Sequence, residues 1–224
     1  MNETEYKIYI DSVIRRVESA RLKVNGHHIV KIVAISKYST SDEIEKLYKI
    51  GQRAFGENKV QDLKTKAQEL EDLPLEWHFV GNLQKNKINN LLDLQPALFH
   101  ALDSLELAHE LQKKLQAREM SLDALLQINS AKEESKHGVM PEVAQAVYAQ
   151  IQSECPNINL KGVMSIGAHT EDKTLIKKSF ETTYKIYKEL KGATICSMGM
   201  SGDFELAIEC GSNMVRLGSI MFNK

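Results

Sequence analysis

Cysteine, proline and tryptophan are scarce in this chain, and their scarcity narrows the class of protein. The 224 residues include three cysteines, four prolines and one tryptophan. The cysteines, Cys155, Cys196 and Cys210, are odd in number and form no C-x-x-C pair, so we expect neither a disulfide framework nor a zinc site. A reducing cytoplasm is therefore the expected location. No linker rich in glycine, serine or proline divides the chain, so residues 1–224 are expected to form a single domain.

Charge of one sign and long apolar runs are also missing. The formal net charge is -1 at pH 7, which gives no reason to expect a nucleic acid or an anionic membrane surface as a partner. No apolar run approaches the roughly 18 residues that a membrane span needs, and residues 1–21 are too polar for a secretory signal. The histidines, His100 among them, show no metal-ligand spacing, so we expect surface or hydrogen-bonded imidazoles and no metal. The rest of the composition, 42% hydrophobic and 26% charged, is typical of a globular protein.

What the sequence does contain is a regular alternation of apolar runs and segments with helical periodicity. Strands are expected at 29–35, 54–55, 76–80, 97–102, 122–128, 160–164, 193–196 and 214–217. Helices are expected at 42–50, 59–70, 86–92, 105–118, 143–151, 175–190 and 204–209, and an extra amphipathic helix at 6–22 precedes the first strand. Such alternation predicts an α/β protein with a parallel sheet, either open and doubly wound or closed. Because the strands number eight, we favour a single (β/α)8 TIM-type barrel with an extra N-terminal helix.

The carboxyl ends of the strands form the working face of such a barrel, and Lys37 directly follows the first strand. With an apolar barrel beneath it, this lysine is expected to be partly desolvated, which would leave its amine free to attack an aldehyde and form a Schiff base. A solvated lysine at a strand end is the plainer interpretation, and position alone favours it.

Two further segments stand after the seventh and eighth strands, where barrels of this kind often hold a phosphate. They are S-M-G-M-S-G-D at 197–203 and V-R-L-G-S at 215–219. Glycine allows close backbone approach, and amides at a helix start bind anions. A tight turn with a helix cap at Ser201 or Asp203 explains the first segment equally well. A Schiff-base lysine and a phosphate site together suggest a phosphorylated aldehyde, of which pyridoxal 5'-phosphate is the common cofactor.

Several motifs extend over nearly the whole chain in one order. They are A-I-S-K at 34–37, G-Q-R-A-F-G-E-N at 51–58, W-H-F-V-G-N-L-Q-K-N-K at 77–87, E-E-S-K-H-G at 133–138, G-V-M-S-I at 162–166, S-M-G-M-S-G-D-F at 197–204 and V-R-L-G at 215–218. Together they resemble the pyridoxal-phosphate homeostasis proteins, also called the proline synthase co-transcribed family.

The resemblance implies a barrel similar to the N-terminal domain of bacterial alanine racemase, with the cofactor held as an internal aldimine on Lys37. It implies a phosphate bound by Ser201, Gly202, Gly218 and Ser219, and a pyridine nitrogen beside Arg216. It implies a cofactor pocket lined by Asn58, His78, Met164 and Met198. The chain departs from the family where S-K-T-K-P is usual, because Tyr38, Ser39 and Thr40 follow Lys37 and the second lysine and the proline are missing. The usual C-terminal I-F-G is Met221-Phe222-Asn223.

The expected function is that of a pyridoxal-phosphate carrier in vitamin B6 homeostasis, without catalytic residues. Arg216 is cationic at any relevant pH and disfavours a protonated ring, which makes the cofactor a poorer electron sink. A racemase of this type also needs a second base from an additional β domain, and the chain ends six residues after Gly218, so no C-terminal β domain is expected. We expect a monomer that delivers the cofactor to apo-enzymes.

Three alternatives remain open from the sequence. A small amino-acid racemase would need an unrecognised second base, for which Tyr38, Lys136 and His137 are candidates. A Schiff-base aldolase would use the same barrel on a phosphosugar without any cofactor. A pure interaction module is the third, although no exposed apolar stripe or charge run is evident.

Overall fold

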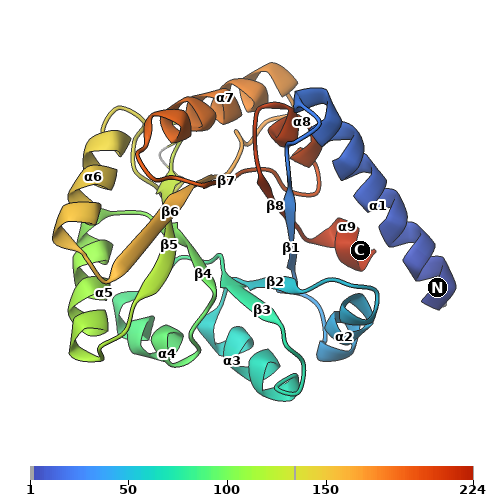
Figure 1. The fold of residues 1–224 in the computed structure, drawn as a ribbon, viewed down its shortest axis with the longest axis horizontal. Coiled ribbons are helices and arrows are strands. Elements are labelled where there is room, and N and C mark those ends of the chain that lie inside the picture. The colour runs from blue at the N-terminus through green and yellow to red at the C-terminus, as the bar shows by residue number, and fades with distance from the viewer. Residues whose placement is uncertain (1–2, 134, 224) are drawn as a thin grey trace.

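The computed structural model describes residues 3–133 and 135–223, and these form a closed barrel of eight parallel strands (Figure 1). The strands follow one another around the barrel in chain order, and β1 pairs with β8 to close it. They are β1 (Lys31–Ile35), β2 (Ala54–Glu57), β3 (Glu76–Phe79), β4 (Leu98–Leu102), β5 (Leu122–Ile128), β6 (Ile158–Ser165), β7 (Ile195–Ser197) and β8 (Met214–Leu217). The barrel prediction is confirmed, and the open doubly wound sheet is excluded.

Helices surround the barrel and cover the outer face of the strands (Figure 1). They are α1 (Glu3–Val24), α2 (Ser41–Lys49), α3 (Val60–Glu69), the short 3₁₀ turn η1 (Lys85–Lys87), α4 (Ile88–Asp93), α5 (Leu105–Ala117), α6 (Ala144–Glu154), α7 (Lys173–Glu189), α8 (Phe204–Glu209) and α9 (Ser219–Phe222). None of the helices in the described ranges is long and apolar enough to cross a membrane.

The extra helix α1 packs against α8 on the outside of the barrel (Figure 1). Its buried residues, Ile10, Val13, Val17 and Ala20, recur at helical spacing, and they join the apolar cluster that contains Phe204 of α8. The amphipathic helix expected at 6–22 is therefore present. Its apolar stripe covers the helical layer outside the last strands, which are the strands that lead into the candidate phosphate loops.

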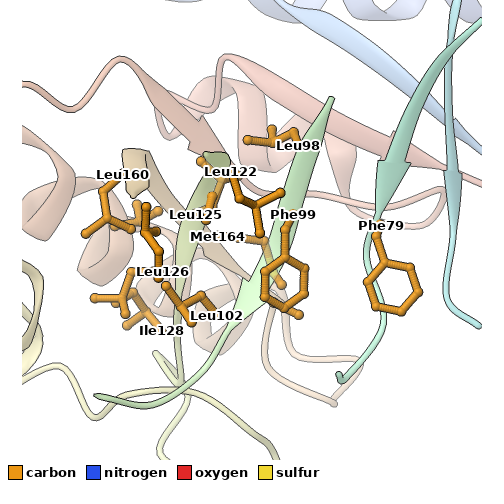
Figure 2. Close-up of a cluster of buried hydrophobic side chains, with 14 of the residues drawn as sticks. Phe79, Leu98, Phe99, Leu102, Leu122, Leu125, Leu126, Ile128, Leu160 and Met164 are labelled. Atoms are coloured by element: carbon orange, nitrogen blue, oxygen red, sulfur yellow. The ribbon is translucent and has the colours of Figure 1, made fainter. Parts of the chain in front are cut away.

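The largest apolar cluster lies around β3 to β6 (Figure 2). Leu125 and Leu126 of β5 have no exposed surface, and the rings of Phe79 and Phe99 stack with centroids 5.9 Å apart. Each such side chain stabilises the fold by about 1.5–3 kcal/mol. Cys196 is buried in this cluster, as expected of a small core residue, and burial raises the pKa of its thiol. The three cysteines are all unpaired and buried.

One boundary difference concerns the first strand. It was expected to begin at Ile29, but β1 begins at Lys31, and Ile29 is 80% exposed. The register with β8 explains this, because strand pairing starts at Lys31 opposite Met214, and Ile29 lies two residues before the first pair. The sequence also gave no sign of α9, a single turn that begins at Ser219 directly after β8.

Candidate functional site

Lys37 lies in a turn directly beyond β1. The Ser39 amide donates to the Ser36 carbonyl over 2.8 Å and closes this turn. The Lys37 side chain is exposed, and its Nζ lies 4.9 Å from the centroid of the Tyr38 ring. The expected partial desolvation is therefore wrong, because β1 ends at Ile35 and the turn carries the lysine out of the apolar interior into solvent. The amine is accessible to a ligand at the carboxyl end of the barrel.

The two glycine-containing segments after β7 and β8 meet at Ser201. Its Oγ accepts hydrogen bonds from the amides of Gly218, at 3.2 Å, and Ile220, at 3.5 Å. There is open space beside the backbone, since a Cβ added at Gly202 would meet no atom within 4 Å. Ser219 is exposed at the start of α9, next to these amides. Two amides thus converge on one oxygen, which is the donor arrangement that a phosphate oxygen requires.

The segment before α8 is also a tight turn, as its plainer interpretation predicted. Asp203 Oδ1 accepts from the Met200 amide at 2.6 Å, but Asp203 makes no side-chain cap to α8. Burial raises the pKa of the Asp203 carboxyl. Gly199 has a φ of +94°, and a Cβ there would lie 2.7 Å from that of Ala207, so glycine is required where this loop passes α8.

Arg216 of β8 is buried, and in the strand register it lies opposite Val33 of β1. Its Nη1 donates to the carbonyl and the hydroxyl of Ser197, at 2.9 and 2.8 Å, and its Nη2 donates to the Ser165 carbonyl at 2.9 Å. Desolvation lowers the pKa of Arg216 to about 10, so the guanidinium stays charged at neutral pH. The structure therefore holds a fixed cation by contacts to β6 and β7.

A chain of polar side chains leads from exposed residues at the starts of β1 and β3 to two buried histidines of β3 and β4. Lys31 pairs with Glu76, and Glu76 Oε1 lies 2.9 Å from His78 Nε2. His78 Nδ1 lies 2.8 Å from His100 Nε2. The hydrogen bond with His78 does most to hold the pKa of Glu76 down, to about 2, so that carboxylate is ionised and accepts the His78 proton. We refer to Lys31, Glu76, His78 and His100 as the interior chain.

The proton on His78 Nε2 decides the state of the next ring. In neutral His78 the other nitrogen is an acceptor, so His100 Nε2 must donate to it. His100 Nδ1 is then also an acceptor, and it is buried without a partner among the described residues. Desolvation lowers the pKa of both rings. The expectation for His100 is therefore only partly right: the ring is hydrogen-bonded through Nε2, but it is fully buried in the barrel and its Nδ1 is not satisfied among the described residues.

The three remaining residues expected around a cofactor lie at or near the carboxyl ends of their strands. Asn58 follows β2 and is half-buried, and its carbonyl approaches Gly81 so closely that a Cβ at Gly81 would lie 2.0 Å from it. Met164 of β6 and Met198, which follows β7, are buried in the apolar cluster around β3 to β6.

Two of the three candidate second bases, Lys136 and His137, are already engaged, whereas Tyr38 is 80% exposed. Lys136 Nζ donates to Glu133 Oε1 at 2.9 Å and to the Gly167 carbonyl at 2.7 Å. His137 Nδ1 lies 3.2 Å from Asp103 Oδ2. Within the described ranges, no group of three or more histidine, cysteine, aspartate or glutamate side chains could hold a metal ion.

Sequence reasoning treated Glu57 only as a strand-end residue and did not single out Lys66. All four residues of β2 are buried, and Glu57 is among them with no exposed surface. The available signal was a carboxylate inside a short strand with buried neighbours, which requires a cationic or hydrogen-bonded partner. That partner is Lys66 of α3, at 2.7 Å.

Comparisons with known proteins agree with this geometry. The family described as "Alanine racemase, N-terminal domain" matches residues 8–224. A protein of Helicobacter pylori strain J99 named "Pyridoxal phosphate homeostasis protein" is 55% identical over 220 residues, which cover 98% of this chain and 99% of that protein.

Two solved structures are also similar. PipY of Synechococcus elongatus, solved with PLP bound, is 31% identical with a TM-score of 0.80, and the match covers 93% of this chain and 98% of PipY. An unknown protein from Bifidobacterium adolescentis has a TM-score of 0.89 and 28% identity, over 98% of this chain and 95% of that one.

Proposed function

This chain belongs to the pyridoxal phosphate homeostasis proteins within the alanine racemase N-terminal domain family, and we propose that it binds pyridoxal 5'-phosphate through Lys37 and helps to control the free level of that cofactor. The observation that carries the proposal is the convergence of the Gly218 and Ile220 amides on one oxygen position. Gly218 is the residue after β8, and its missing Cβ would lie 3.7 Å from the carbonyl of Ile35, two residues before Lys37. A phosphate-binding backbone and a reactive amine thus stand on neighbouring strands.

Each residue of the site has a physical role in this proposal. The amides of Gly218 and Ile220 hold the phosphate, and Ser201 turns its hydroxyl from those amides to the phosphate oxygen. Gly202 and Ser219 border the same position, and Asn58, His78, Met164 and Met198 surround the ring. Arg216 holds the ring nitrogen without giving up its proton, since its guanidinium stays charged. When bound, the cofactor would supply an aldehyde with which the neutral Nζ amine of Lys37 would condense, with loss of one water, to a Schiff base.

We assign the protein a carrier role rather than an enzymatic one. A charged Arg216 at the ring nitrogen disfavours the protonated ring that stabilises carbanions. Lys136 is committed to Glu133 and Gly167, so it is poorly placed to act as a second base. The proposal includes a cytoplasmic monomer that passes the cofactor to apo-enzymes, and the three buried, unpaired cysteines fit a reducing compartment.

The test is an absorbance spectrum of the purified protein mixed with pyridoxal 5'-phosphate, followed by borohydride reduction and mass mapping. We expect a Schiff-base band and a pyridoxyl adduct on Lys37. Lys37→Ala should abolish both, whereas Lys64→Ala, which removes an exposed lysine of α3, should change neither. A band that survives in Lys37→Ala, or an adduct elsewhere, contradicts the assignment. Turnover of an amino acid between its stereoisomers by the pure protein contradicts the carrier role.

A further inference from the structure

The most buried pair of a lysine or arginine with a carboxylate in the described ranges lies beside Lys37. Glu57 Oε1 accepts from Lys66 Nζ at 2.7 Å, and the two side chains are 0% and 12% exposed. A surface pair such as Arg16 with Glu205 is 45% and 46% exposed. Because desolvation makes a buried pair weak evidence for stability, its position has to be explained by what else it touches.

Both partners of this pair touch Ser36, the residue before Lys37. Ser36 Oγ donates to Glu57 Oε1 at 2.6 Å, and the Ser36 carbonyl accepts from Lys66 Nζ at 2.7 Å. We call Ser36, Glu57 and Lys66 the Ser36 clamp.

Every polar atom of Ser36 is thereby used. Its amide donates to the Gly56 carbonyl at 3.0 Å, and its carbonyl also accepts from the Ser39 amide at 2.8 Å. Contacts from β2, from α3 and from the turn itself hold one buried residue. The backbone at the base of Lys37 is therefore fixed, while the lysine side chain remains exposed.

Glu57 keeps one unused acceptor. Its Oε2 is buried and has no partner among the described residues. An unpartnered buried acceptor costs stability, so a pair that served folding alone would gain from a second donor there. The hydrogen bonds of Glu57 are instead concentrated on the oxygen that contacts Ser36 and Lys66.

We propose that the Ser36 clamp is a positioning device for Lys37, which holds the backbone at the base of this lysine so that its amine meets the aldehyde of the cofactor in one orientation. Correct orientation of two reacting groups accelerates a covalent step, and a more mobile backbone at Lys37 would lose part of that acceleration. Ser36, Glu57 and Lys66 are positioning residues that act through Lys37. The inference rests on the proposed attachment of pyridoxal 5'-phosphate to Lys37.

The main variant replaces both charges, Glu57→Gln with Lys66→Met, because a double change leaves no unpaired charge in the interior. Ser36→Ala removes one hydrogen bond without touching either charge, and Lys66→Arg keeps the cation. Lys64→Met is the matched control on the exposed face of α3.

The first readout is the rate at which pyridoxal 5'-phosphate forms a borohydride-reducible adduct on Lys37. We expect it to be slowed about tenfold in the double variant and about threefold in Ser36→Ala. Lys66→Arg and the control should remain near the native rate.

The second readout needs no cofactor. Amide hydrogen exchange should become about tenfold faster at Ser36 and Ser39 in the double variant, because their partners are loosened, while amides of β5 keep native protection. A purely structural role would instead accelerate exchange throughout the barrel and leave the rate at Lys37 unchanged in variants that fold. If the double variant does not fold, Ser36→Ala and Lys66→Arg decide the question.

The outcomes separate the two proposals. If the native protein forms no adduct on Lys37, the proposed function is wrong. If the native protein forms it and Ser36→Ala and the double variant form it at the native rate with native exchange at Ser36 and Ser39, the positioning role is wrong.

Discussion

Two polar arrangements that include buried side chains lie at opposite ends of the strands of this barrel, and they are built in opposite ways. The Ser36 clamp lies at the carboxyl end of β1, and its ionised groups are paired with each other. The interior chain starts from the Lys31–Glu76 pair and ends on His100, a neutral ring with one nitrogen that has no partner in the described part of the chain. The clamp fixes a backbone, whereas the interior chain fixes the proton positions of two imidazoles.

Because of this difference, the two arrangements should respond differently to the loss of one side chain and to acid. Breaking the clamp requires the loss of a partner, because a buried ion pair is held by charge on both sides. The interior chain stays intact only while His78 and His100 are neutral, and burial keeps them so by lowering their pKa values. We therefore expect the clamp to be sensitive to mutation and the interior chain to be sensitive to acid.

The largest expected effect comes from breaking the clamp on one side. Glu57→Ala leaves the Lys66 ammonium largely buried without its carboxylate, which should lower the free energy of unfolding by about 3–5 kcal/mol. Urea denaturation at neutral pH measures this. The exposed Glu45–Lys49 pair of α2 supplies the control, and Glu45→Ala should give no measurable change. Equal effects of the two substitutions would remove the distinction between a buried clamp and a surface ion pair.

Acid should act on the interior chain instead. Unfolded histidines take up protons below about pH 6.5, but the lowered pKa values keep His78 and His100 neutral in the folded protein. The unfolded state then binds more protons, so between pH 6.5 and 5 the free energy of unfolding should fall by up to about 1.4 kcal/mol per pH unit for each ring that is still neutral in the folded protein. Stability contributed by Glu76 is lost only as the pH falls toward its value of about 2, below this window.

His100→Gln tests the assignment, because its amide can still donate to His78 but cannot titrate. The slope of unfolding free energy against pH should fall to about half its native value, measured by urea denaturation between pH 5 and 6.5. An unchanged slope would show that His100 does not contribute to the acid sensitivity.

The same comparison explains what the sequence could predict. The eight strands and α1 follow from apolar periodicity, which is local along the chain. The meeting of the two candidate phosphate loops at Ser201 follows from their places after the last two strands of a barrel. Both of these predictions depend on patterns within a segment or on the order of segments.

The clamp and the interior chain depend on pairings between segments, which no local pattern encodes. Ser36 and Lys66 are 30 residues apart and come together only because α3 folds back over the end of β1. His100 Nδ1 is an acceptor without a partner among the described residues because His78, on a different strand, carries its proton on Nε2 and so requires His100 Nε2 to donate. The exposure of Lys37 depends on where pairing with β2 ends β1, at Ile35 opposite Gly56, so the expected desolvation is wrong although the place of Lys37 just after the first strand was predicted correctly.

The smallest expected effect concerns the candidate phosphate loops, which share no residue with either arrangement. Ser201→Ala removes the oxygen that the Gly218 and Ile220 amides share, so the free energy of unfolding should fall by about 1 kcal/mol in cofactor-free protein. Inorganic phosphate should restore part of this loss, because its oxygen accepts from the same amides, while sodium chloride at equal ionic strength should not. Thermal unfolding measures both. If phosphate stabilises the variant no more than chloride does, these amides do not form an anion site.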